Sequence, residues 1–224
     1  MRGQTQPVVL TLIATVVVGS VTTAYIWGEP ILQKGQGQAE IDTLEQDVTD
    51  LHSQIIQVAE SGEGASETVR IGDGISASDN FRISVNDDEN AIEITERSQN
   101  VEYPLDTWIG LEGSTFQNIS FGQGDYAIQG EDEPGILAVR AEGSPEEQIL
   151  TYRSEFRNMF TTRSTGNRLE RIELVSDGRQ TISEPSTIVI SNEGERVETG
   201  EDSVELSTGE RFERFNTRID IDLR

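Results

Sequence analysis

Few residues of this chain can do chemistry, and their spacing matches no common catalytic motif. His52 is the only histidine and cysteine is absent from the 224 residues, so disulfides and thiolate chemistry are excluded. The sequence has no P-loop, no H-E-x-x-H motif and no dinucleotide-binding glycine pattern that follows a strand and opens a helix. We therefore predict that the chain is not an enzyme and has no catalytic or cofactor-binding residues.

Carboxylates are abundant, but none of their groupings has the pattern of a metal site. Asp87, Asp88 and Glu89 are consecutive, and Asp73 lies between two glycines; such oxygen ligands can hold Ca²⁺. Neither stretch has the spacing of an EF-hand loop, and acidic hairpin tips are usually solvated. We predict no metal ligands and no cofactor.

The charge balance is strongly acidic. The 17 basic and 41 acidic residues give a net charge of -24, and Lys34 is the only lysine. A field of this sign argues against nucleic acid or anionic lipid as partners of the acidic part. Because salt screens such charges, the composition favours adaptation to very high salt, as in a halophilic archaeon. Disorder is the other explanation of high charge, but the apolar residues after position 67 fall into short alternating runs.

The N-terminal stretch is apolar. Between Arg2 and Glu29 lie 26 residues without a charge, and Val8–Trp27 is 20 residues long, which spans about 30 Å as a helix. We predict a transmembrane helix over 4–34, with the membrane as its partner. Small side chains recur at every fourth position and form a stripe suited to close helix packing, although such residues are also common in membrane helices: Thr11, Thr15, Gly19 and Thr23.

Three interpretations of this N-terminal stretch remain open. It is a plain anchor oriented by Arg2, or a secretory signal cut after Ala24, or a retained helix behind a short leader. For the third, the sequence Met1-Arg2-Gly3-Gln4 ahead of the helix resembles the class III signal of archaeal type IV pilins and archaellins. That resemblance implies cleavage between Gly3 and Gln4 by a prepilin peptidase, with the helix then forming a filament core beside other pilin-like subunits.

A second, amphipathic helix is predicted after a glycine hinge at 35–38. The apolar residues of 39–60 alternate by three and four, as heptad positions a and d do: Ile41, Leu44, Val48, Leu51, Ile55 and Val58. This stalk helix packs either on its own β domain, as the resemblance implies, or on copies of itself as a coiled coil. His52 flanks the stripe at an e position, so we expect a surface or rim histidine rather than a catalytic one. A glycine linker ends at residue 64.

The apolar period changes to two over 65–224, which predicts an extracytoplasmic all-β domain. Phe81–Val85 and Ala91–Thr95 alternate strictly around a polar loop, as a hairpin does. Asp177-Gly178 predicts a tight hairpin between 171–175 and 181–182. Arg218–Leu223 alternates with Ile219, Ile221 and Leu223 inward. About a dozen short strands without an intervening helix predict an antiparallel β-sandwich or barrel-like domain.

Together these patterns predict an α+β chain with a leader over 1–3, a transmembrane helix over 4–34, a stalk over 35–64 and the β domain over 65–224. The cytoplasmic N-terminus and the β domain outside would place the chain at the cell membrane and cell surface. Asn118, in the only N-x-S/T sequon, is then a candidate glycan acceptor. The expected function is a structural subunit or minor component of an archaeal surface filament. The alternative is a singly anchored β module that binds an envelope, S-layer or archaellum-stator partner.

The leader can be tested directly. If the class III resemblance holds, the mature protein begins at Gln4, and Gly3→Val leaves an unprocessed precursor, because the peptidase needs the small residue at the cut. N-terminal sequencing of the protein from its host measures this. A chain that begins at Tyr25 favours secretion, and one that begins at Met1 favours a plain anchor.

Overall fold

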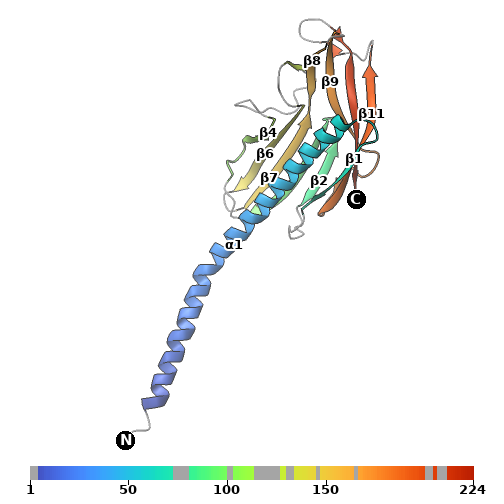
Figure 1. The fold of residues 1–224 in the computed structure, drawn as a ribbon. Helices are drawn as coiled ribbons and strands as arrows, with labels where there is room; N and C mark the ends of the chain where they lie inside the picture. Colours follow the sequence, from blue (N-terminus) through green and yellow to red (C-terminus); the bar gives the residue numbers. More distant parts are fainter. Residues whose placement is uncertain are drawn as a thin grey trace.

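The computed structural model describes residues 5–72, 81–99, 103–113, 127–129, 134–144, 147–163, 166–199, 204–205 and 211–224. Along the helix, the side chains of 5–14, 19, 21–34 and 36 are not among those described. The predicted features at Gly3, Gln4, Asp73, Asn118 and the strand at 117–121 lie outside the described residues. Figure 1 shows one long helix whose C-terminal half lies against two β-sheets and whose N-terminal half projects away from them.

A single helix, α1 (Thr5–Ser61), runs through 57 residues, about 86 Å at 1.5 Å per residue. The predicted hinge at 35–38 is therefore wrong, since helix continues through Gly35 and Gly37. Each glycine costs about 1 kcal/mol relative to alanine. That cost is small when helix is already formed on both sides, because propagation from an existing helix avoids a new nucleus.

Of the residues that the structure describes, none forms a helix with both the length and the apolar character needed to cross a membrane. This finding contradicts the predicted transmembrane helix over 4–34, and with it the membrane and cell-surface localisation.

The helix ends in a turn that returns the chain along its own flank. Gly62 and Gly64 have φ angles of +88° and +84°, a backbone region that glycine enters without steric cost. The Ala65 amide donates to the Gly62 carbonyl over 3.1 Å. This turn brings the chain directly into β1, which pairs with β11.

Two six-stranded sheets and a small ribbon account for the strands. The first sheet has the order β1 (Ser66–Ile71), β11 (Ser186–Glu198), β14 (Arg214–Leu223), β9 (Gly166–Val175), β8 (Asn158–Arg163) and β5 (Ala127–Gln129). The second has the order β10 (Thr181–Ile182), β2 (Arg82–Asn86), β3 (Ala91–Gln99), β7 (Glu147–Phe156), β6 (Gly135–Ser144) and β4 (Trp108–Glu112). The ribbon pairs β12 (Val204–Glu205) with β13 (Arg211–Phe212). The described chain is thus mostly β, with one helix, so the predicted α+β class is wrong.

The strand pairing differs from the prediction in two places. The sheets are not purely antiparallel, because β14 pairs with β9 in parallel and β5 pairs with β8 in parallel. The hairpin predicted at Asp177-Gly178 is also wrong, since β9 and β10 belong to different sheets and this connection crosses between them. The hairpin predicted from the alternation at 81–95 is confirmed as β2 and β3, with Ile83 opposite Ile94.

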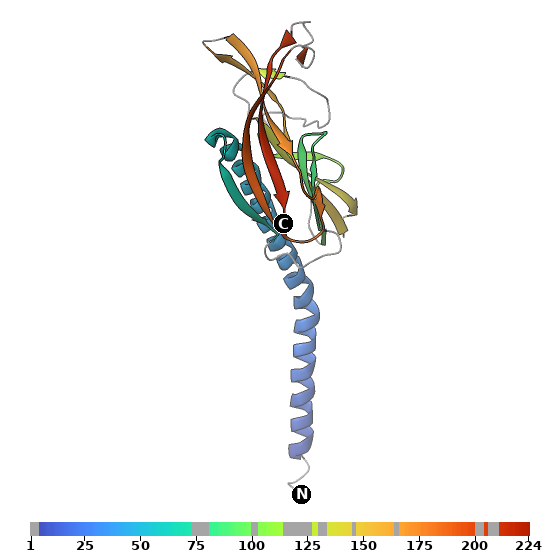
Figure 2. The ribbon, with the colours of Figure 1, turned by 90° about the vertical axis from the view of Figure 1, so that its right-hand side faces the viewer.

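The C-terminal half of α1 is part of the core rather than a separate stalk. It covers one face of both sheets (Figures 1 and 2) and contacts β1, β11 and β14 of the first sheet and β3 and β6 of the second. All six residues of the heptad stripe are at most 2% exposed, in one cluster with strand residues such as Ile83, Tyr152 and Ile190. The predicted coiled coil is therefore wrong. The chain's own β domain already covers the stripe.

Asn90 joins the two sheets. It has a φ of 53°, a left-handed conformation that asparagine tolerates. Its buried side chain donates from Nδ2 to the Phe156 carbonyl over 2.8 Å and to the Ile172 carbonyl over 2.7 Å. Its Oδ1 accepts from the Leu174 amide over 2.7 Å. One amide therefore satisfies three backbone groups, one on β7 and two on β9.

We predict that Leu51→Ala lowers the free energy of unfolding of the full chain by about 2–5 kcal/mol, because it opens a cavity in this core. Gln57→Ala, at an exposed position of the same helix, is the control and should change stability by less than about 0.5 kcal/mol. Denaturant unfolding measures both. Equal effects would mean that the helix is not part of the core.

Candidate functional site

The two halves of α1 have opposite surroundings, and this contrast defines the candidate site. In the free half, the side chains of Val16, Val17 and Val18 are 59%, 55% and 65% exposed. From Ile41 onward the apolar face is buried in a groove formed by both sheets, here called the seat. The free half thus exposes apolar side chains, and the seat holds the helix at a fixed place relative to the β domain.

Two carboxylates of the helix fasten the seated half. Asp47 accepts a hydrogen bond from the Gly72 amide over 2.9 Å at the end of β1. Glu45 accepts one from the Tyr103 hydroxyl over 2.5 Å. Burial, the hydrogen bond to Glu45 and the Glu45 charge together raise the pKa of Tyr103 well above its usual value. Tyr103 therefore stays a donor, and this contact persists at neutral pH.

Asn192 clasps the C-terminal end of α1. Its Nδ2 donates to the Val58 carbonyl over 3.0 Å and to the Ala59 carbonyl over 3.2 Å. These carbonyls belong to the last turn, where the helix itself supplies no amide. Its Oδ1 accepts from the Gly194 amide over 2.8 Å, at the point where the register of β11 shifts. The irregularity in β11 thus places the Asn192 side chain against the C-terminal end of the helix.

His52 lies at the centre of the seat, so the expectation of a surface or rim histidine is wrong. The side chain is 0% exposed, and its ring stacks on Phe156 with centroids 5.5 Å apart. Nδ1 lies 2.7 Å from the Ser154 hydroxyl oxygen. Burial lowers the pKa of His52 to about 4. The ring is therefore neutral at pH 7. The Ser154 hydroxyl is within reach of Nδ1, but Nε2 has no hydrogen-bond partner among the described residues, so no described carboxylate orients this ring as in a catalytic triad.

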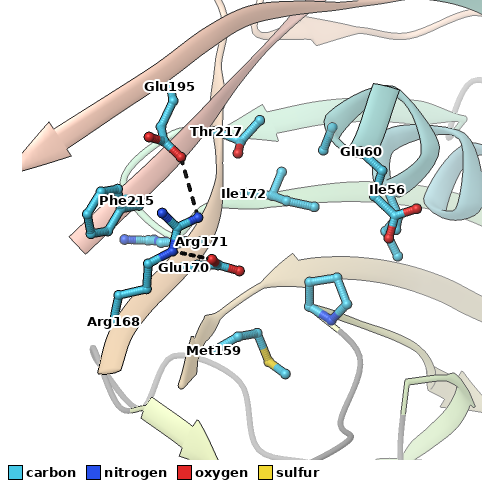
Figure 3. A pocket seen from close by; sticks show the side chains of 12 residues that line it. Ile56, Glu60, Met159, Arg168, Glu170, Arg171, Ile172, Glu195, Phe215 and Thr217 are labelled. Atoms are coloured by element: carbon cyan, nitrogen blue, oxygen red, sulfur yellow. Dashed lines mark hydrogen bonds and ion pairs between the residues drawn. The ribbon is translucent and has the colours of Figure 1, made fainter. Parts of the chain in front are cut away.

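A cavity of about 490 Å³ lies where the helix ends (Figure 3). Arg168 projects into it beside Phe215, with the guanidinium 4.3 Å from the ring centroid. The same guanidinium pairs with Glu170 and lies 3.8 Å from Glu195. Arg171 also lines the cavity, but the carboxylates of Glu60, Glu170 and Glu195 outnumber the two arginines, so the cavity is a weak site for an anion. Apolar side chains such as Met159 and Ile172 complete its wall.

The acidic hairpin tip has a structural partner. Arg153 pairs with Glu89 over 2.8 Å, with Glu93 over 2.6 Å and with Glu155 over 3.0 Å. Burial acts to lower the pKa of Arg153, but hydrogen bonds to Glu93 and Glu89 and the charge of Glu155 outweigh it and raise the pKa. Among the described residues, no group of three or more histidine, cysteine or acidic side chains is arranged to hold a metal ion.

The structure brings together some predicted site residues and leaves others undescribed. The six stripe residues line the seat. Thr15 is exposed on the free half, while the side chains of Thr11, Gly19 and Thr23 lie outside those described. Sequence reasoning did not find Asn90, Asn192 or Ser154. For Asn90 a signal exists, since an asparagine that ends a polar loop just before a strand is typical of a left-handed turn residue.

We predict that Asn192→Ala destabilises the full chain by about 2–4 kcal/mol, because it leaves the Gly194 amide and two helix carbonyls without this partner. Ser191→Ala, the preceding position of β11, is the control; its hydroxyl meets that of Ser66 at an exposed site. Thermal unfolding in the same buffer measures both. Variants of equal stability would show that the hydrogen bonds of Asn192 to the helix end do not stabilise the chain.

Comparisons with known proteins identify no relative of this chain. No family model, no curated protein and no solved structure matches it. The resemblance of the first residues to class III signals has no support from these comparisons and stays a prediction.

Proposed function

We propose that this protein is a structural subunit of a filament. In this assembly the free halves of α1 from many copies pack together as the core, and the β domains stand outside. The observation that carries the proposal is the exposure of three consecutive valines on a helix that projects from the domain.

Consecutive positions of an α-helix point about 100° apart. Val16, Val17 and Val18 therefore cover roughly 200° of the circumference, which is far wider than the stripe of a helix that packs on one side. A helix that is apolar over most of its circumference needs partners on several sides. This favours a bundle core over a simple pair of helices.

The charges are distributed as such an assembly requires. Every acidic residue lies at or after Glu29, and the stretch from Gly3 to Gly28 carries no charged side chain. Acidic β domains repel one another, so attraction between subunits has to come from the uncharged half of α1. The resemblance of the first residues to the class III signal implies the same arrangement, with the helix in the filament core and the acidic domain outside.

A second candidate function is a monomeric β module that binds one partner protein. The cavity at the end of α1 favours it, because a hollow lined by apolar side chains such as Ile56 and Met159 could receive a side chain of the partner. In this case the free half of α1 would not self-associate. The two functions therefore differ in one measurable property, the oligomeric state of the full chain.

We predict that the full chain forms sedimentable polymer in high salt and that Val17→Asp abolishes it, because a buried unpaired carboxylate is costly in an apolar helix bundle. Gln57→Asp, on the exposed face of the seated half, is the matched control and should assemble like the wild type. Sedimentation and electron microscopy of the three proteins test this. A wild type that stays monomeric, or a Val17→Asp variant that still polymerises, excludes the filament core.

A further inference from the structure

The side chains and backbone around His52 pack closely against its ring and suit the uncharged form. The two neighbouring strands β6 and β7 enclose it with Gly135, Ser154 and Phe156. A Cβ atom added at Gly135 would lie 2.5 Å from the His52 Cε1 atom, so this strand approaches as closely as it does only because the residue is glycine. Phe156 stacks on the ring with an interplanar angle of 17°.

The hydrogen bonding of the ring also fits the neutral form. Nδ1 meets the Ser154 hydroxyl at 2.7 Å, and a hydroxyl can serve either tautomer. Nε2 is buried and has no hydrogen-bond partner among the described residues. A protonated imidazole carries N–H on both nitrogens. Protonation would therefore place a charged donor at Nε2 in a site that offers it no acceptor.

The charged groups on the sheets next to His52 do not stabilise its protonated form. On β4, Glu112 accepts a hydrogen bond from Ser53, the neighbouring helix position, over 3.5 Å. Just after β7, Arg157 donates to the Gly113 carbonyl over 3.4 Å. Its positive charge opposes the negative charge of Glu112. Burial alone accounts for the lowered pKa of His52.

The remaining charges are turned away or lie further along the elements. Arg153 and Glu155 flank Ser154 on β7, so their side chains point to the opposite face of the sheet. There they form an ion pair with each other. On β3, Ile92 lies opposite Ser154. Glu96 is four residues further along this strand, a distance of about 13 Å. On α1 itself, Glu45 and Asp47 are engaged by the Tyr103 hydroxyl and the Gly72 amide, and Asp50 is exposed.

We propose that His52 makes the attachment of α1 to the β domain pH-dependent, so that acidification loosens the helix in its seat. The direction follows from linkage. In the open state the ring is solvated and binds a proton near its ordinary pKa of 6.5, whereas in the seat it does so only near 4. The open state therefore binds more protons between these values, and attachment weakens as pH falls from 6.5 toward 4. The proposal concerns one chain and does not depend on filament assembly.

Hydrogen exchange of the helix amides 48–58 in the full chain tests it, after correction for the intrinsic exchange rate at each pH. Between pH 7.5 and pH 5.5 the opening equilibrium constant of the wild type should rise about tenfold. His52→Gln, which keeps a neutral polar group, should show no such rise. Ordinary carboxylates remain ionised over this range, so the difference between the two proteins isolates the histidine.

Two further measurements keep the test decisive. In His52→Gln/Gln57→His the histidine moves to an exposed helix position, and the pH dependence should stay absent. Because His52 is the only histidine, an NMR titration of the wild type follows its ring directly and does not rely on any variant folding. The proposal is overturned if the ring of the folded protein titrates near 6.5 or above, or if the wild type and His52→Gln open with the same pH dependence.

Discussion

The structure depends on the burial of one apolar stripe of α1 against both sheets. The stripe residues are at most 2% exposed, and they belong to the same cluster as buried residues from nearly every long strand. Each sheet has an apolar inner face that must be covered, and the helix supplies that cover for both. Asn90 adds a second link, since its side chain bonds β7 to β9. The domain is therefore two sheets completed by a helix that precedes them in the chain.

An apolar stripe alone does not specify where along the groove the helix lies. Spacings of three and four repeat after seven residues, so a slide of one heptad, about 10 Å, would present a similar set of apolar side chains. Polar contacts remove this ambiguity because each is formed only at the observed position of the helix: Asp47 with the Gly72 amide, Glu45 with Tyr103, and Asn192 with the last helix turn. A slide would break all three contacts and would leave the buried Asn192 side chain without its helix partners, at about 1–3 kcal/mol.

Local patterns in the sequence predicted the stripe, the hairpin of β2 and β3, and the inward face of β14 with Ile219, Ile221 and Leu223 buried. These features depend on neighbours along the chain. The errors concern interactions between distant residues. A break at Gly35 and Gly37 follows from local propensity, which the continuous helix overrides. The Asp177-Gly178 turn crosses between sheets because β10 pairs with β2. His52 is buried because Gly135, far along the chain, leaves room for its ring.

The continuity of α1 has a mechanical consequence. A flexible hinge between the two halves would let the β domain take any orientation relative to the free half. One unbroken helix instead transmits the fixed register of the seat to residues about 50 Å away, since the free half spans roughly 35 residues at 1.5 Å each. Any partner that holds the valines at 16–18 therefore also fixes where the domain stands. The contacts that lock the helix into its seat, rather than the free half itself, determine how precisely an assembly can position its acidic domains.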